Sequence, residues 1–118
     1  MDKKRILLVD DEESIQLLYR EEFEDEGYLV DSASNGVEAL AKFSENPPDL
    51  VILDINMPGM NGIEVLRQMK EARTDVPIIL SSAYQEYKQD FGTWASEAYV
   101  VKSANLDELK ATVRKHLT

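Results

Sequence analysis

The sequence contains no cysteine, which excludes disulfide bridges, a thiolate nucleophile and a zinc–thiolate site. It also lacks a long apolar stretch, because the run after the basic residues 3–5 ends at Val9, too short for a signal peptide or a membrane span. Cations are few, with 13 Lys and Arg against 23 Asp and Glu and a formal net charge of −10. Direct binding to nucleic acid or to an anionic membrane needs basic patches that this balance does not supply. We therefore expect a cytoplasmic protein whose partners are other proteins.

What the chain does contain is a regular alternation of short apolar runs and helical patterns. With 118 residues, 43% of them hydrophobic, it fits one domain spanning residues 1–118. The alternation repeats five times, which is typical of βαβ units and predicts an α/β fold with a doubly wound, five-stranded parallel sheet and about five helices. The predicted strands are 5–9, 28–33, 50–53, 77–82 and 98–101, and the predicted helices follow them, including a weak, polar one at 84–91 and a last one from Asn105. The run at 50–53 is wholly aliphatic, so we expect that strand at the centre of the sheet.

Polar and charged residues stand where several of these runs stop. Asp10 and Asp11 follow the first strand, Asp54 follows the third, Ser82 ends the fourth and Lys102 follows the fifth. The carboxyl ends of parallel strands lie along one edge of a sheet, so these side chains are predicted to converge there.

Three carboxylates in one crevice imply a cation. Two like charges about 4 Å apart repel by about 4 kcal/mol at an effective dielectric of about 20. An all-oxygen site favours Mg²⁺, which is typically held by carboxylates together with phosphate oxygens. Asp54, at the end of the central strand, is best placed to attack a phosphoryl group and form an aspartyl phosphate. Lys102 and the Ser82 hydroxyl can then contact the phosphoryl oxygens.

Each of these residues also has a purely structural interpretation. The acidic run that starts at Asp10 suits the first turn of a helix, Asp54 can cap a turn, and Lys102 can lie in solvent. Taken singly, each structural interpretation is the more frequent one. Their joint placement at the strand ends favours a site.

The same residues resemble the receiver domain of two-component response regulators, over essentially the whole chain. The resemblance rests on Asp10-Asp11 after the first strand, Asp54 within the segment 53–62, Ser82-Ala83, and Tyr99 three residues before Lys102. It implies a flavodoxin-like strand order, 2-1-3-4-5. It also implies that Asp54 accepts phosphate from the phosphohistidine of a sensor histidine kinase or a histidine phosphotransfer protein.

The resemblance further implies a role for each matching position. Mg²⁺ would be held by Asp11, Asp54 and the backbone carbonyl of Asn56, with Asp10 assisting indirectly. The phosphoryl group would be stabilised by Lys102, Ser82 and the Ala83 backbone. The switch would be formed by Ser82 and Tyr99. Phosphorylation would alter the face built from the helix at 84–91, the last strand and the last helix. That face would bind a downstream effector protein or output domain, or a second copy of the chain.

One position departs from the family pattern. Ser103 follows Lys102, where the family usually has a proline in a cis peptide. A cis bond before a residue other than proline costs about 2.5–4 kcal/mol, so we predict a trans Lys102-Ser103 bond.

Other functions are compatible with a similar fold. A degenerate receiver would act as a phosphorylation-independent scaffold, but the acidic residues and Lys102 are all present. An aspartyl-nucleophile phosphatase generally has a second acid where this chain has Asn56, and a flavodoxin would not place Asp10 and Asp11 beside its phosphate. We expect a phospho-accepting signalling domain rather than an enzyme. It would be a stand-alone receiver, a phosphorelay intermediate or part of a longer regulator.

Overall fold

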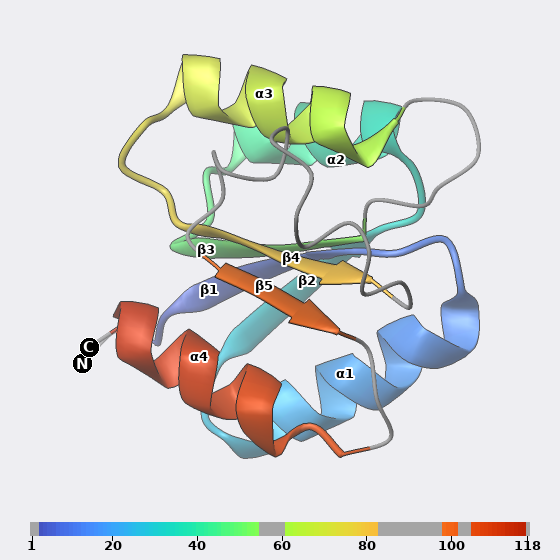
Figure 1. Cartoon of the computed structure of the whole chain (residues 1–118), viewed down its shortest axis with the longest axis vertical. Helices are drawn as coiled ribbons and strands as arrows, with labels where there is room; N and C mark the ends of the chain where they lie inside the picture. Colours follow the sequence, from blue (N-terminus) through green and yellow to red (C-terminus); the bar gives the residue numbers. More distant parts are fainter. Residues whose placement is uncertain (1–2, 55–60, 83–97, 102–104, 118) are drawn as a thin grey trace.

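The computed structural model describes residues 3–54, 61–82, 98–101 and 105–117, and within these ranges the predicted alternation of strands and helices is confirmed (Figure 1). The elements are β1 (Arg5–Val9), α1 (Glu13–Asp25), β2 (Leu29–Ala33), α2 (Gly36–Glu45), β3 (Leu50–Asp54), α3 (Gly62–Ala72), β4 (Ile78–Ser82), β5 (Ala98–Val101) and α4 (Asp107–Leu117). The helix predicted at 84–91 lies outside the described residues.

The five strands form one parallel sheet in the order β2-β1-β3-β4-β5, which is the flavodoxin-like order that the resemblance implied. The aliphatic strand β3 is central, as predicted, and all its residues are buried. Val9 of β1 pairs with Leu53 of β3, and Leu53 pairs with Leu80 of β4. This register brings the carboxyl ends of the three strands level with one another.

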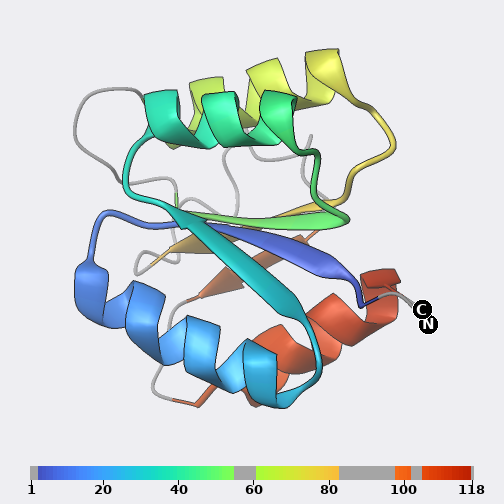
Figure 2. The same cartoon turned by 180° about the vertical axis from the view of Figure 1, so that it is seen from behind.

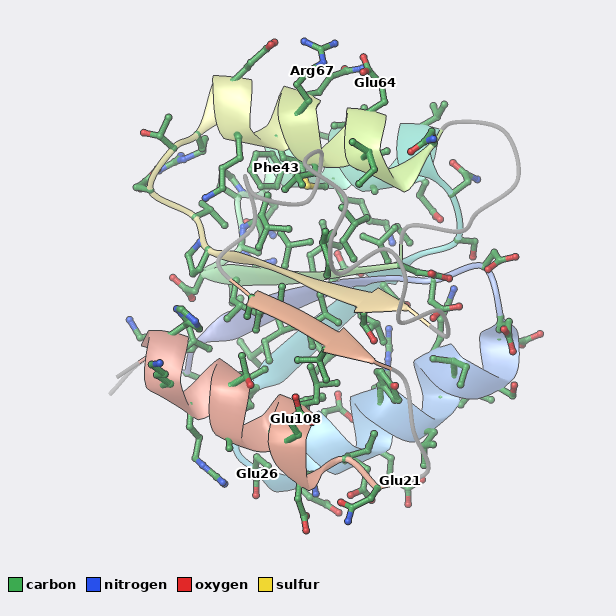
Figure 3. The ribbon with its side chains drawn as sticks, viewed as in Figure 1. Glu21, Glu26, Phe43, Glu64, Arg67 and Glu108 are labelled. Carbon is green, nitrogen blue, oxygen red and sulfur yellow. The ribbon has the colours of Figure 1, made fainter. Side chains whose placement is uncertain are left out.

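Helices cover both faces of the sheet. Helices α2 and α3 lie on one face and α1 and α4 on the other, in both views of the molecule (Figures 1 and 2). Because successive side chains of a strand point to opposite faces, Val51 and Leu53 join the apolar cluster under α2 and α3, where Phe43 also lies (Figure 3). Leu50 and Ile52 join the cluster under α1 and α4. Burial on two faces explains why residues 50–53 of β3 are all aliphatic.

The helix ends follow local capping chemistry. The Asn35 side chain caps α2 by accepting a hydrogen bond from the backbone N–H of Glu38, at 2.8 Å. The chain leaves α1 through Gly27, which has a φ of 96°, in the region that favours glycine. The last helix begins at Asp107, two residues later than predicted, because Asn105 accepts from the Asp107 N–H and lies before the first turn. None of the described helices is long and apolar enough to cross a membrane.

Candidate functional site

Three carboxylates meet at the carboxyl edge of the sheet, as the sequence predicted. Asp10 and Asp11 follow β1, and Asp54 ends the neighbouring strand β3. One oxygen from each of the three side chains lies within 4.8 Å of the others. Asp10 and Asp54 are only 2% and 4% exposed, whereas Asp11 is exposed. The cluster therefore has a buried floor and one ligand that reaches the surface.

The position of Asp10 is fixed by hydrogen bonds on both sides. Its backbone N–H donates to the carbonyl of Ala33 at 3.1 Å, which extends the β1–β2 ladder by one residue. One oxygen of its carboxylate accepts from the backbone N–H of Glu12 at 2.9 Å, at the start of α1. These two contacts hold Asp10 in place at the junction of strand and helix.

Gln16, on the first turns of α1, joins this junction to β2. Its side-chain amide nitrogen donates to the carbonyl of Asp10, at 2.5 Å, and to the Ser34 hydroxyl, at 3.1 Å, and it reaches the Ala33 carbonyl at 3.4 Å. The sequence analysis missed Gln16. The signal for it was its place on α1 one to two turns after the acidic pair, where a long polar side chain can reach back to the strand ends.

The donor set fits a hard divalent cation. Every ligand atom that the described cluster offers is a carboxylate oxygen, which Mg²⁺ prefers, and neither sulfur nor imidazole nitrogen takes part. Three carboxylates so close together repel each other strongly unless a cation lies between them. The cluster can therefore bind a metal ion, with Asp11 presented to solvent and Asp54 at the end of the central strand.

Strand β4 brings two serines to the same edge. Ser81 is the ladder partner of Asp54, and Ser82 pairs with Val101 of β5. Ser81 is 2% exposed, and among the described residues its hydroxyl is the buried side-chain group without a hydrogen-bond partner. The sequence analysis did not single out Ser81, although a polar residue directly after the aliphatic residues 78–80 was a visible signal.

The remaining predicted site residues are placed only in part or not at all. Tyr99 lies in β5, paired with Leu80, but the structure describes neither its side chain nor that of Ser82. Three predicted site residues and the predicted trans peptide lie outside the described residues: Asn56, Ala83, Lys102 and the Lys102-Ser103 bond. The structure thus brings together the acidic part of the predicted site.

Helix α1, which begins beside the acidic cluster, exposes apolar side chains. Leu17 is 63% exposed and Leu18 is 43% exposed. Two ion pairs link α1 and its C-terminal end to α4, Lys110 to Glu22 at 2.6 Å and Arg114 to Glu26 at 2.8 Å. The hydrogen bond with Glu22 raises the pKa of Lys110, although partial desolvation opposes the shift.

Comparisons with known proteins agree with this geometry. The family model described as "response regulator receiver domain" matches residues 6–114. Sporulation initiation phosphotransferase F from Bacillus subtilis is 37% identical over 119 residues, which cover 99% of this chain and 96% of that protein. Several curated regulatory proteins match at 37–40% identity, but this chain spans only 25–52% of their length.

Solved structures give the same result. The response regulator protein TrrA from Thermotoga maritima, in complex with Mg²⁺-BeF, is 53% identical and superposes with a TM-score of 0.94, over 97% of this chain and 99% of that one. A structure of the histidine kinase ThkA in complex with TrrA matches with 52% identity and a TM-score of 0.92, over 98% and 99% of the two chains.

Proposed function

This chain belongs to the response regulator receiver family, and from that premise we propose that residues 1–118 form a receiver domain that is phosphorylated on Asp54. The observation that carries the proposal is the acidic cluster at the carboxyl edge of the sheet, in which Asp54 is buried between Asp10 and strand β4. In the reaction a carboxylate oxygen of Asp54 forms a bond to phosphorus. The bond from phosphorus to the donor histidine nitrogen breaks, and the imidazole leaves with the electron pair.

The cation of this reaction is proposed to be Mg²⁺. Its ligands would be Asp11, Asp54 and the backbone carbonyl of Asn56, with Asp10 acting indirectly. Support comes from the all-oxygen donor set and from the Mg²⁺-BeF complex of TrrA. When bound, the cation offsets the negative charge of the carboxylates and of the incoming phosphoryl oxygens. Asp10 keeps its own place through the hydrogen bond from Glu12, so it can orient the ligands around it.

The phosphoryl group would also be contacted from the strand ends on the other side. We propose that Lys102, the Ser82 hydroxyl and the Ala83 backbone stabilise its oxygens, and that Ser82 and Tyr99 form the switch. Ser82 ends β4, and Tyr99 lies in the neighbouring strand β5, paired with Leu80, which supports the assignment. The resulting change would reach the face formed by residues 84–91, β5 and α4, where an effector protein, an output domain or a second copy of the chain would bind.

The phosphoryl donor would be a sensor histidine kinase or a histidine phosphotransfer protein that contacts α1. Support comes from the exposed Leu17 and Leu18 on α1, the helix that begins directly after the acidic pair, and from the complex of TrrA with the kinase ThkA. Exchange of Ser14, Ile15, Leu17 and Leu18 for the residues of a receiver with another cognate kinase should change which kinase phosphorylates the chain. Unaltered kinase preference after the exchange would show that specificity lies elsewhere.

The proposed function is signalling in the cytoplasm rather than catalysis on a separate substrate. The test is intact mass after incubation with acetyl phosphate, with Mg²⁺ or with EDTA. The wild type should gain one phosphoryl group only with Mg²⁺, and hydroxylamine should remove it, as expected for an acyl phosphate. Asp54→Asn should gain nothing, whereas Asp25→Asn, which changes an exposed acid at the end of α1, should behave as the wild type.

A negative result has a defined meaning in this experiment. If the wild type gains no phosphoryl group under any condition, the chain is a phosphorylation-independent scaffold on a receiver fold. If Asp54→Asn is still phosphorylated, the acceptor is a different residue.

A further inference from the structure

Ser81 is a buried polar side chain that the proposed roles do not use. It lies in β4, is 2% exposed, and its hydroxyl has no hydrogen-bond partner among the described residues. Buried polar groups are nearly always paired, because a hydroxyl removed from water without a partner loses hydrogen bonds that nothing replaces. An orphan of this kind destabilises the state in which it occurs and requires an explanation.

The strand register places this hydroxyl beside Asp54. The two residues are ladder partners, on adjacent strands about 4.8 Å apart. Ile79, two residues before Ser81, and Ile52, two residues before Asp54, both belong to the apolar cluster under α1 and α4. Because side chains alternate along a strand, Ser81 and Asp54 leave the sheet on that same face. The orphan hydroxyl therefore lies on the floor of the acidic site.

We propose that Ser81 is a further binding residue of this site, whose hydroxyl donates a hydrogen bond to the Asp54 side chain once the cation and the phosphoryl group are bound. The inference rests on the proposed phosphorylation of Asp54. In the resting protein the hydroxyl has no hydrogen-bond partner within the part of the chain that the structure describes, so its burial disfavours that state. In the loaded protein the same group gains an acceptor, so its contribution shifts the equilibrium towards the loaded state.

The test compares thermal unfolding of the wild type and Ser81→Ala, in EDTA and with Mg²⁺ and beryllofluoride as the phosphoryl mimic. In EDTA, Ser81→Ala should unfold at a higher temperature than the wild type, because the orphan is gone. When Mg²⁺ and beryllofluoride replace EDTA, the unfolding temperature of Ser81→Ala should rise by less than that of the wild type. Its apparent affinity for beryllofluoride should fall on the order of five- to tenfold, as expected for the loss of one hydrogen bond.

Two controls make the comparison specific. Ser32→Ala removes a serine hydroxyl that does have a partner, Arg20, at 2.9 Å and on the edge strand β2. It should lower the unfolding temperature in EDTA and leave the rise on loading unchanged. Ser81→Thr keeps the hydroxyl, so its unfolding temperature should rise as much as that of the wild type when Mg²⁺ and beryllofluoride are added. This holds whatever the added methyl group does to the unfolding temperature in EDTA.

The possible failures are distinguishable. If Ser81→Ala is less stable than the wild type in EDTA, the hydroxyl already has a partner in the resting protein, such as a buried water, and the inference is wrong. Equal rises in the wild type and Ser81→Ala would also overturn it. If the wild type itself shows neither a rise nor a gain of mass with acetyl phosphate, the proposed function fails and this inference fails with it.

Discussion

The acidic cluster should make the metal-free protein less stable than a variant with one charge fewer. Each pair of carboxylate oxygens lies within 4.8 Å, a distance at which two unit charges repel by about 3.5 kcal/mol at an effective dielectric of about 20. Asp54→Asn removes two such pairs, but Asp11 is exposed and solvent screens its share. We therefore expect the change to raise the free energy of unfolding in EDTA by about 1–3 kcal/mol.

Urea and thermal denaturation measure this difference directly. For a chain of 118 residues, each kcal/mol corresponds to about 4 °C in the midpoint of thermal unfolding. Saturating Mg²⁺ should stabilise the wild type more than Asp54→Asn, because binding to the folded state adds to its stability, and the difference between the two should narrow. Glu21→Gln, which removes one exposed charge in the middle of α1, controls for the change in net charge. An Asp54→Asn protein no more stable than the wild type in EDTA would refute the reasoning.

Three further changes test other contacts of the fold. Gln16→Ala removes an amide that donates to two backbone carbonyls and a hydroxyl. The change should lower the free energy of unfolding by about 1–2 kcal/mol and weaken Mg²⁺ binding. Urea titrations with and without Mg²⁺ measure both effects. Hydrogen bonding to Glu22 raises the pKa of Lys110 above 10.5, so this pair stabilises the fold at neutral pH and its contribution disappears as pH rises through the raised pKa. Glu22→Gln should accordingly be less stable than the wild type at neutral pH and lose less stability in alkaline buffer, as followed by circular dichroism. Gly27→Ala, at a φ of 96° and with no atom near the added methyl group, should cost about 1 kcal/mol from backbone strain alone, a loss that equilibrium denaturation would detect.

Much of the fold was predictable because burial leaves a direct mark on the sequence. The aliphatic run of β3 follows from contact with helices on both faces, and it identified the central strand before the topology was known. The strand order itself came from the resemblance, since alternation alone is compatible with several orders. Convergence of Asp10, Asp11 and Asp54 required only that the strands be parallel and end together.

The contacts that sequence reasoning missed depend on which residues pair across the sheet and on how far a long side chain extends. Ser81 ranks as an ordinary strand residue until the ladder pairs it with Asp54 on the same face of the sheet. Gln16 is one of several polar residues on α1, and only the three-dimensional path of the β1–α1 junction brings its amide to the Asp10 carbonyl. The start of α4 differed by two residues for a similar reason, because Asn105 pairs with the nearer N–H of Asp107.

Two effects are expected to destabilise the resting site, the repulsion among its carboxylates and the burial of the Ser81 hydroxyl, and they can be measured separately. Repulsion among the carboxylates should be relieved by the cation alone, whereas the Ser81 hydroxyl should gain its acceptor only when the phosphoryl mimic is also bound. Mg²⁺ alone should therefore narrow the stability difference between Asp54→Asn and the wild type and leave the difference between Ser81→Ala and the wild type unchanged. Addition of beryllofluoride should then narrow the difference in unfolding temperature between Ser81→Ala and the wild type. If Mg²⁺ alone closed both differences, the acceptor of the Ser81 hydroxyl would be created by metal binding and not by the phosphoryl group.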